Sequence, residues 1–273
     1  MLGTNNYFNR INESLNKKRF QEDEESFNEE LVSTKIDIRK NVDLFAEHDE
    51  MFDSLKKFPN KQNKVTEEDL YEENGGTAIM IKVDNKLIIA ADTRLNAEYN
   101  IYTRFSTKIF KIGDFYLTAV GFYGDAYNIF IRLNYELNQY EQYKKMSLSA
   151  LAQYLHQVLY SRRFFPLYAY CNLGGYENGE AIIYTFDCVG SYQSTSCRVD
   201  GSGTKMIQPL LDSWIDGKNF KNYKGISFKD AVDLIKKAFD SAAESDVKTG
   251  DTLEIIVNDN GEEQKEYVEL RKD

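Results

Sequence analysis

Apolar stretches interrupted by short polar turns predict two antiparallel hairpins in the middle of the chain. The stretches 74–83 and 86–94 are mostly apolar and flank Asp84-Asn85, a pair typical of a tight turn between two strands. The same pattern recurs at 109–112 and 115–121, where Gly113-Asp114 is the expected turn. We therefore predict four strands at the start of the folded region.

Helical periodicity follows each of two blocks of strands. Apolar residues at spacings of three and four predict a helix over 124–143 and a second helix after Ser147, whose hydroxyl is suited to cap it. Behind Gly201-Ser202-Gly203 the pattern predicts a short helix that reaches Trp214. Ser227 and Asp230 then form a capping box at the start of a long helix.

The remaining apolar stretches predict five further strands. Three follow the first two helices, at 167–173, 181–186 and 192–199, with a turn over 174–179. The last two strands, at 252–257 and 266–270, flank Asn260-Gly261. Because strands and helices come in blocks, we predict an α+β fold in which helices cover sheets, and not alternating β-α-β units.

Composition divides the chain near residue 74. Residues 1–74 hold 18 acidic and 11 basic side chains, a net charge of −7, whereas the whole chain of 273 residues carries −10. Clusters such as Glu22-Asp23-Glu24-Glu25 and a low apolar density are typical of a disordered tail, or of a prosegment that orders against a partner. We predict an acidic leader over 1–74 that is trimmed from a folded domain over 75–273.

Charge and cysteine content argue against several functional classes. The net charge of −10 argues against nucleic-acid and anionic-membrane partners, and no stretch is apolar for the length that a membrane helix needs. Cys171, Cys188 and Cys197 lack the spacing of a metal site, so we expect no metal, no cofactor and a reducing compartment. The N-terminus has no signal-peptide pattern, so the expected location is the cytoplasm and nucleus.

Few residues have the spacing of a catalytic motif. The sequence has no GxGxxG, P-loop or HExxH segment, and nothing supports a Ser/His/Asp triad built on His156. Asp92 at the end of the second strand and Lys108 before the third remain. On three adjacent strands of one sheet, they would suit an N-terminal nucleophile enzyme, in which a threonine hydroxyl is activated by its own amine and a lysine. The alternative is that Asp92 and Lys108 form a structural ion pair.

Several segments together resemble the β subunits of the proteasome. The segments similar to that family's opening and site regions are Gly76-Thr77, Ala90-Ala91-Asp92-Thr93-Arg94 with Lys108, Gly121-Phe122-Tyr123-Gly124-Asp125, Gly201-Ser202-Gly203 and Asp246-Val247-Lys248-Thr249-Gly250-Asp251. Others resemble the non-catalytic β positions in particular: Asn74-Gly75-Gly76-Thr77, Tyr160-Ser161-Arg162-Arg163-Phe164-Phe165-Pro166, Asp187-Cys188-Val189-Gly190-Ser191-Tyr192-Gln193, Gln208-Pro209-Leu210-Leu211-Asp212 and Leu270-Arg271-Lys272-Asp273. Cys188 departs from the proline expected there.

The resemblance implies an αββα sandwich of the N-terminal nucleophile (Ntn) hydrolase type, with two antiparallel sheets between layers of helices. In active members the threonine precedes the aspartate and the lysine at fixed distances, and counting back from Asp92 and from Lys108 reaches Gly76 in both cases. Thr77 is one residue late, and a shift of one residue in a strand turns a side chain to the opposite face. We therefore expect no catalytic nucleophile, but a vestigial site made of Asp92, Lys108, Ser202, Asp246 and Thr249.

The resemblance implies a structural role in the 20S core particle, which degrades ubiquitinated proteins. Expected partners are β subunits of the same ring, the opposing β ring, the α ring and the protein substrates of the complex. Dense aromatic residues place a subunit contact at residues 160–168, with the candidates Arg162, Arg163, Phe164 and Phe165. The alternatives are an active threonine endopeptidase with Thr77 as its N-terminal nucleophile, and a free-standing amidase of the same fold.

Overall fold

The computed structural model describes residues 71–97 and 100–272, which form two five-stranded antiparallel sheets and a small hairpin. The predicted leader up to residue 70 lies outside the described residues. The first sheet has the order β10-β1-β2-β11-β12. Its strands are β1 (Thr77–Val83), β2 (Lys86–Asp92), β10 (Cys197–Gly201), β11 (Thr252–Asp259) and β12 (Glu262–Glu269).

The second sheet has the order β5-β6-β7-β8-β9. Its strands are β5 (Ile109–Ile112), β6 (Phe115–Gly121), β7 (Ala169–Glu177), β8 (Glu180–Phe186) and β9 (Tyr192–Thr195). A separate hairpin of β3 (Leu95–Ala97) and β4 (Asn100–Thr103) follows β2. The sequence pattern did not predict this hairpin, because its strands are too short to produce a visible alternation.

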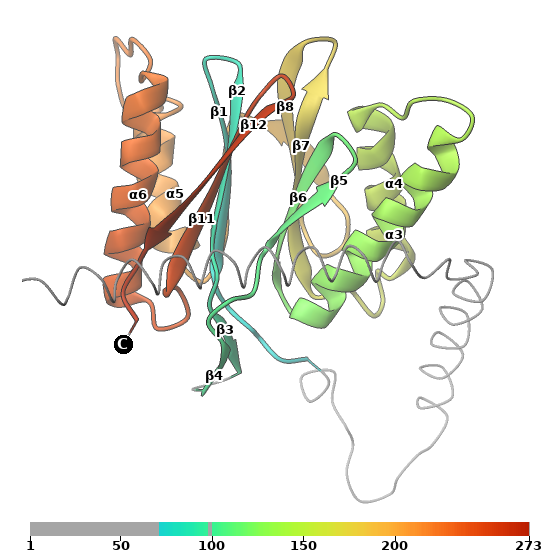
Figure 1. Ribbon diagram of the computed structural model, residues 1–273, viewed down its shortest axis with the longest axis horizontal. Helices are drawn as coiled ribbons and strands as arrows, with labels where there is room; N and C mark the ends of the chain where they lie inside the picture. The colour runs from blue at the N-terminus through green and yellow to red at the C-terminus, as the bar shows by residue number, and fades with distance from the viewer. Residues whose placement is uncertain (1–70, 98–99, 273) are drawn as a thin grey trace, which may run out of the picture. The chain divides into compact units, whose positions relative to one another are not determined.

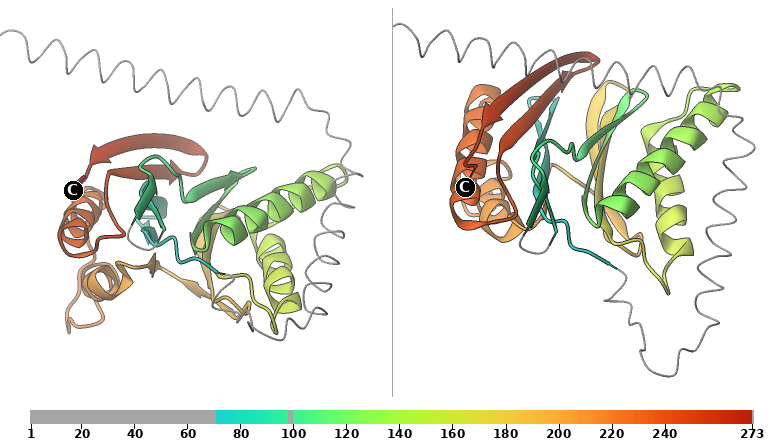
Figure 2. Two further views of the ribbon diagram at one scale, coloured as in Figure 1. Left: turned by 90° about the horizontal axis from the view of Figure 1, so that it is seen from below. Right: turned by 60° about the horizontal axis from the view of Figure 1, so that its bottom comes forward.

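The two sheets stack face to face, and helices cover both outer surfaces (Figures 1 and 2). The helices α3 (Tyr123–Glu141) and α4 (Leu148–Ser161) pack on the second sheet, and α5 (Thr204–Trp214) and α6 (Phe228–Ser245) pack on the first. This arrangement confirms the predicted αββα sandwich. No helix among the described residues is long and apolar enough to cross a membrane.

The turn and cap residues act as the sequence predicts. Asp84 and Asn85 both have positive φ, 51° and 59°, as a tight hairpin turn between β1 and β2 requires. The Ser147 hydroxyl accepts a hydrogen bond from the N–H of Ala150 at the start of α4. The Ser227 hydroxyl accepts one from the N–H of Asp230 at the start of α6.

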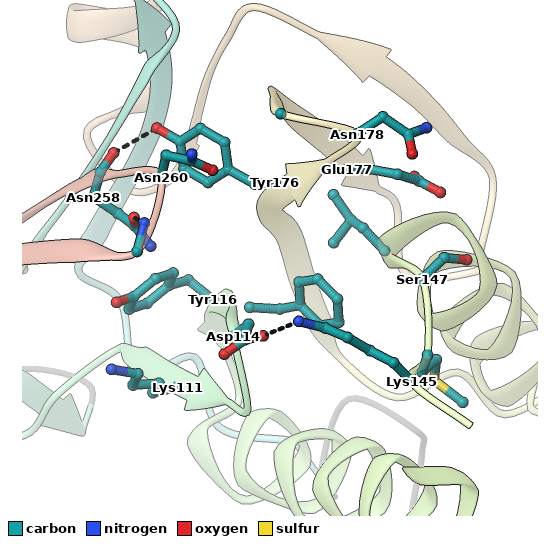
Figure 3. Close-up of a pocket in the computed structure, with 15 residues that line it drawn as sticks. Lys111, Asp114, Tyr116, Lys145, Ser147, Tyr176, Glu177, Asn178, Asn258 and Asn260 are labelled. Carbon is teal, nitrogen blue, oxygen red and sulfur yellow. Dashed lines mark hydrogen bonds and ion pairs between the residues drawn. The ribbon is translucent and has the colours of Figure 1, made fainter. Parts of the chain in front are cut away.

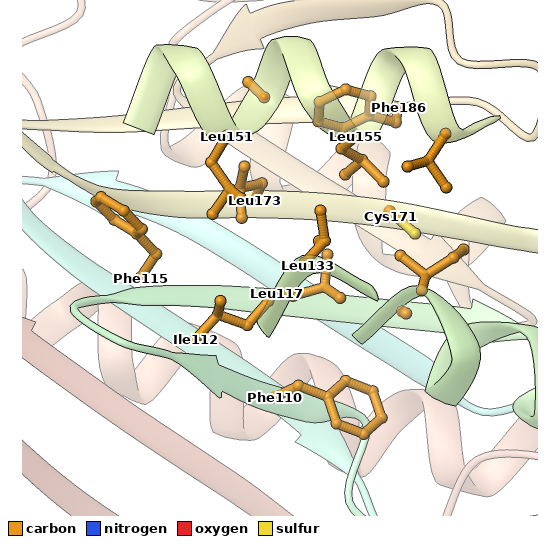
Figure 4. Close-up of a cluster of buried hydrophobic side chains, with 14 of the residues drawn as sticks. Phe110, Ile112, Phe115, Leu117, Leu133, Leu151, Leu155, Cys171, Leu173 and Phe186 are labelled. Atoms are coloured by element: carbon orange, nitrogen blue, oxygen red, sulfur yellow. The ribbon is translucent and has the colours of Figure 1, made fainter. Parts of the chain in front are cut away.

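Burial of apolar side chains between the layers holds the sandwich together. Between the second sheet and its helices, Leu117 and Leu173 from the strands meet Leu133 and Leu155 from α3 and α4, and all four are fully buried (Figure 4). A fully buried leucine contributes about 1.5–3 kcal/mol to the free energy of folding. Alternation along β1 assigns its side chains to two different clusters, one between the sheets and one under α5 and α6.

Some of the predicted strand boundaries are wrong: the last strand, for example, begins at Glu262 and not at residue 266. The predicted turn over 174–179 is mostly strand, because β7 continues through Gly174 to Glu177 and only Asn178-Gly179 form the turn. Glycine is required there by the opposing sheet, since a Cβ on Gly174 would lie 2.3 Å from the Met80 sulfur.

The single strand predicted over 192–199 is two strands in different sheets. The chain bends at Ser196, so that β9 pairs with β8 in the second sheet and β10 pairs with β1 in the first. This crossing brings the end of β10 and Gly201 beside the start of β1. A pattern of apolar residues cannot locate such a crossing, because both strands alternate in the same way.

Candidate functional site

The candidate site lies at the start of β1, where neighbouring positions face opposite sides of the first sheet. Ala78 and Met80 are packed between the two sheets, whereas Ile79 and Ile81 are packed under α5 and α6. The alternation places position 76 toward the second sheet and Thr77 toward the helices. This alternation of side chains along β1 decides which residue could reach Lys108.

Lys108 reaches the site from the second sheet. It directly precedes β5, so the expectation that Asp92, Lys108 and the first strand share three adjacent strands of one sheet is wrong. The two sheets converge here instead. A Cβ placed on Gly76 would lie 2.2 Å from Lys108 Cε, 2.6 Å from its Nζ and 2.9 Å from Asp92 Oδ1. Gly76 therefore occupies the position that faces the lysine and the aspartate.

Asp92 is completely buried and its carboxylate accepts four hydrogen bonds. Oδ1 accepts from the N–H of Thr77 at 2.7 Å and from Lys108 Nζ at 3.2 Å. Oδ2 accepts from the N–H groups of Arg94 and Gly250, both at 3.2 Å. Burial raises the pKa of the Asp92 carboxyl, and Lys108 with two of these backbone donors opposes the shift. The carboxylate links β1, β2 and the loop before β11.

Lys108 uses all of its donors inside the protein. Nζ lies 2.8 Å from the Asp92 carbonyl oxygen, 3.2 Å from Asp92 Oδ1 and 2.7 Å from the Arg94 carbonyl oxygen. An ammonium group has three N–H donors, so none is left for another group. Burial lowers the pKa of the Lys108 ammonium, and the Asp92 carboxylate opposes that shift.

The Thr77 hydroxyl lies in a different hydrogen-bond network, on the helix side of the sheet. It accepts a hydrogen bond from the N–H of Gly203 at 2.9 Å and is paired with the Thr249 hydroxyl at 2.8 Å. Thr249 Oγ1 in turn donates to Asp246 Oδ2 at 2.6 Å. The Thr77 hydroxyl is thus held on the face away from Lys108, which is the arrangement expected from the one-residue shift.

Ser202 holds the peptide bond that precedes Thr77. The carbonyl oxygen of Gly76 accepts hydrogen bonds from the Ser202 N–H at 3.0 Å and from the Ser202 hydroxyl at 3.3 Å. The structure therefore brings together all five predicted scaffold residues around positions 76 and 77: Asp92, Lys108, Ser202, Asp246 and Thr249.

Asn74 fixes the chain just before the site, a role that the sequence analysis missed. Its side chain donates to the Asn96 carbonyl at 2.8 Å and accepts from the N–H of Tyr123 at 2.7 Å. Its own N–H donates to the Gly121 carbonyl, and its carbonyl accepts from Asn96. The side chain is buried, so this segment is part of the folded body and not a free end.

The space beside Lys108 is closed. The cavity lined by Asn74, Gly75, Leu95, Lys108 and neighbouring residues measures 10 Å³, about the room that one water molecule requires. Pockets that hold organic ligands measure roughly 300–1,000 Å³. A substrate side chain does not fit beside Lys108 while Asn74 and Gly75 keep these positions.

A buried ion pair ties the site to the C-terminus. Arg94 is 2% exposed, and its Nε donates to Asp251 Oδ2 at 2.9 Å while its Nη2 donates to the Arg271 carbonyl at 3.3 Å. Arg104 also pairs with Asp251 and donates to the Lys272 carbonyl at 2.7 Å. Apart from Arg104, the residues of this clamp lie in three of the segments that resemble the proteasome β subunits, namely 90–94, 246–251 and 270–273, but no spacing rule connects them.

In the predicted contact segment after α4, some side chains pack against the folded body and others are exposed. Phe164 is 89% exposed, and the Arg163 guanidinium lies 5.7 Å from the centre of its ring. Phe165 is half-buried and packs on Tyr71, with 5.6 Å between ring centres, while the Tyr71 hydroxyl donates to the Pro166 carbonyl. Arg162 is half-buried. Phe164 and Arg163 are therefore the members that face outward.

A larger cavity of about 490 Å³ lies at the turns that end β5, β7 and β11 (Figure 3). Its charged lining groups pair among themselves or with close neighbours: Lys145 with Asp114 at 2.7 Å, and Glu177 with the Ser149 hydroxyl at 2.9 Å. These pairs leave the cavity without a charge aimed at a ligand, so we assign it no function. Within residues 71–97 and 100–272, no group of acidic, histidine or cysteine side chains could hold a metal ion.

The αββα sandwich of two antiparallel sheets between helices is of the Ntn-hydrolase type. The family model described as "Proteasome subunit" matches residues 72–257. The chain belongs to the proteasome subunit family.

Known relatives narrow this assignment to the β type. The chain is 44% identical over 207 residues to a probable proteasome subunit beta type-6 of Encephalitozoon cuniculi, covering 75% of this chain and 71% of that protein. It is 40% identical over 214 residues to proteasome subunit beta type-1 of Oryza sativa subsp. japonica, covering 75% and 97%. It is 33% identical over 218 residues to proteasome subunit beta type-6 of Saccharomyces cerevisiae, covering 74% and 90%. This chain is therefore a β-type proteasome subunit, a class that assembles with other proteasome subunits in rings.

Replacing Gly76 by alanine should destabilise the protein through contact with Lys108. Gly76 has φ of 80°, and Gly225 has φ of 81° with nothing within 4 Å of the place where a Cβ would lie, so Gly225→Ala is a matched control for backbone strain alone. We expect the control to cost about 1 kcal/mol of unfolding free energy and Gly76→Ala about 1–3 kcal/mol more. Urea unfolding of both variants measures the difference, and equal losses would show that position 76 does not contact Lys108.

Proposed function

We propose that this chain is a non-catalytic β subunit of the 20S proteasome core, which contributes to ring structure and carries no peptidase activity. One observation carries the proposal: the position that faces Lys108 and Asp92 is Gly76, which has no hydroxyl. An N-terminal nucleophile must lie beside its activating lysine. The donors of Lys108 are instead all used by Asp92 and Arg94.

The alternative nucleophile, Thr77, has the right functional group on the wrong face of the strand. Its hydroxyl pairs with Thr249 and Gly203, and its N–H donates to Asp92. Cleavage before Thr77 would free the amine but would leave the hydroxyl where it is unless β1 shifted by one residue. Such a shift would also move every apolar side chain of β1 to the wrong side of the sheet.

The mature N-terminus tests the proposal against this alternative. Because Asn74 makes four hydrogen bonds to the body, we expect trimming to stop upstream of Asn74 in the native particle. Intact mass and N-terminal sequencing of the subunit from purified particles locate the cut. A mature chain that begins at Thr77 would overturn the proposal in favour of a threonine endopeptidase.

Since this chain has no nucleophile of its own in the proposal, the purified precursor alone should not trim itself.

Replacing Lys108 by alanine should leave every peptidase activity of the particle unchanged, because Lys108 has no threonine to activate. The variant should be less stable by about 1–3 kcal/mol, since it removes one donor from the buried Asp92 carboxylate and leaves three. Fluorogenic peptide assays on particles of equal subunit content measure the activity. Lys111→Ala is the control for loss of an exposed lysine. Loss of one activity from fully assembled Lys108→Ala particles would contradict the structural role.

The segment after α4 supplies a test of ring contact. The double substitution Phe164→Ser with Arg163→Glu removes the exposed ring and reverses the charge stacked on it, so it should block incorporation into the particle. The isolated chain should keep its circular-dichroism spectrum, because neither side chain is buried. Lys237→Glu, on the exposed face of α6, is the charge-matched control. Normal assembly of the double variant, or unfolding of the isolated chain, would place the segment outside the interface.

A further inference from the structure

The connection between α5 and α6 is long and internally ordered. It covers residues 215–227, and connections of this length without helix or strand usually carry a function. Gly217 has φ of 63°, and a Cβ there would lie 2.3 Å from Tyr223 Cγ, so the tyrosine ring packs directly on the glycine. The Tyr223 hydroxyl donates to the Trp214 carbonyl, and the Asn219 side chain donates to the Ser213 hydroxyl at 2.8 Å.

This order holds three aromatic rings in a partly exposed row. Trp214 and Phe220 are 48% and 49% exposed, with 5.9 Å between ring centres, and Phe220 stacks on Tyr223 at 6.2 Å. Exposing large rings on a fixed loop lowers stability unless a partner covers them. Rigid aromatic side chains are also the usual anchors of protein interfaces, because little side-chain entropy is lost when they bind.

The same loop is basic in an acidic chain. Residues 214–229 contain four lysines and one acidic residue, Asp216, while the whole chain carries −10. Lys218 pairs with Asp212 and Asp216, at 2.8 and 3.0 Å. Lys221, Lys224 and Lys229 are exposed, and among the described residues none of them has an ion-pair partner. The charge of the loop is therefore available to an outside carboxylate.

The basic aromatic loop lies at the opposite end of the sheet from the vestigial site. The N–H of Phe228, where α6 begins, donates to Asp84 in the β1–β2 turn at 3.3 Å. Gly76 directly precedes β1 and Asp92 ends β2, so both lie at the ends of these strands that are away from the turn. A partner on this loop would not approach Lys108, so its binding is independent of whether the subunit is catalytic.

We propose that the basic aromatic loop, residues 214–229, docks an acidic segment of a partner protein in which apolar side chains alternate with carboxylates. The apolar side chains of the partner cover Trp214 and Phe220, and its carboxylates pair with Lys221 and Lys224. Aromatic rings with lysines also suit single-stranded nucleic acid. The full chain has a net charge of −10, of which residues 1–74 carry −7, and this charge opposes a long polyanion more than a short acidic segment.

Trp214 is the only tryptophan of the chain, so its emission in the full-length protein reports directly on the loop. The probe is a synthetic peptide of alternating glutamate and leucine, and the control peptide has glutamine in place of glutamate. We expect the acidic peptide, and not the control, to shift Trp214 emission to shorter wavelength. Added salt should weaken binding, because the exposed charges are screened. No shift with the acidic peptide, or an equal shift with both, would overturn the proposal.

Variants then assign the binding to the loop. Lys221→Glu with Lys224→Glu should weaken binding of the acidic peptide by about tenfold or more, and Phe220→Ser, which keeps the charge, should weaken it as well. Lys144→Glu with Lys237→Glu makes the same charge change at exposed lysines elsewhere and should leave binding unchanged. If this control weakened binding equally, the net charge of the protein would explain the loss of binding, and the assignment to the loop would be overturned. Stronger binding of oligothymidylate than of the peptide would identify a nucleic-acid surface instead, and would also overturn it.

Discussion

The ion pair between Lys108 and Asp92 is the contact on which the rest of this region depends, because it joins the two sheets where they converge. Asp92 closes β2 in the first sheet and Lys108 precedes β5 in the second. Neither group is reached by solvent, and their hydrogen-bonding capacity is taken up by backbone groups and by each other. A buried pair of this kind tolerates little displacement, so it fixes the position of the start of β1 relative to both sheets.

Because side chains alternate between the two faces of β1, this fixed position determines which residue faces Lys108. Met80 and Ile81 show that adjacent residues of β1 belong to different layers of the core. Sliding the strand by one residue to bring Thr77 over Lys108 would exchange these two sets of side chains. The cost would be the burial energy of several large apolar residues, far above the gain from one hydrogen bond. The packing of the whole first sheet therefore holds Gly76, and not Thr77, against the lysine.

Most of the fold could be predicted from the sequence, because local rules and tertiary packing agree for most elements. The Asp84-Asn85 turn and the caps at Ser147 and Ser227 are local features, and the structure has all three. The strand predictions that failed are those in which contacts with the other sheet matter. β7 contains Gly174 because the Met80 sulfur of the opposing sheet occupies the place of a side chain there. At Ser196 the chain leaves the edge of one sheet, where β9 pairs with β8, and joins the edge of the other, where β10 pairs with β1.

The site was predictable only through spacing shared with a family, since the relevant distances run across the sandwich. Counting from Asp92 and Lys108 located Gly76, and its Cβ position lies against both side chains. The role of Asn74 was missed because its partners are backbone groups of other segments. The Arg94 clamp was missed because Asp251 lies far away in sequence and another partner is the backbone carbonyl of Arg271. A backbone partner leaves no residue pattern at the other end of the bond.

A subunit without a nucleophile can still be expected to keep the rest of the site, for a reason of electrostatics. Removing a hydroxyl from position 76 leaves no buried charge unpaired, so the change to glycine costs little in the folded state. Removing Lys108 or Asp92 alone would leave its partner buried without its counter-charge, and for Lys108 we expect a loss of about 1–3 kcal/mol. Both would have to change together, and the Arg94 and Gly250 N–H groups that bond Asp92 would then lack acceptors. Packing and electrostatics alone are therefore sufficient to retain the lysine and the aspartate, whether or not the subunit is catalytic.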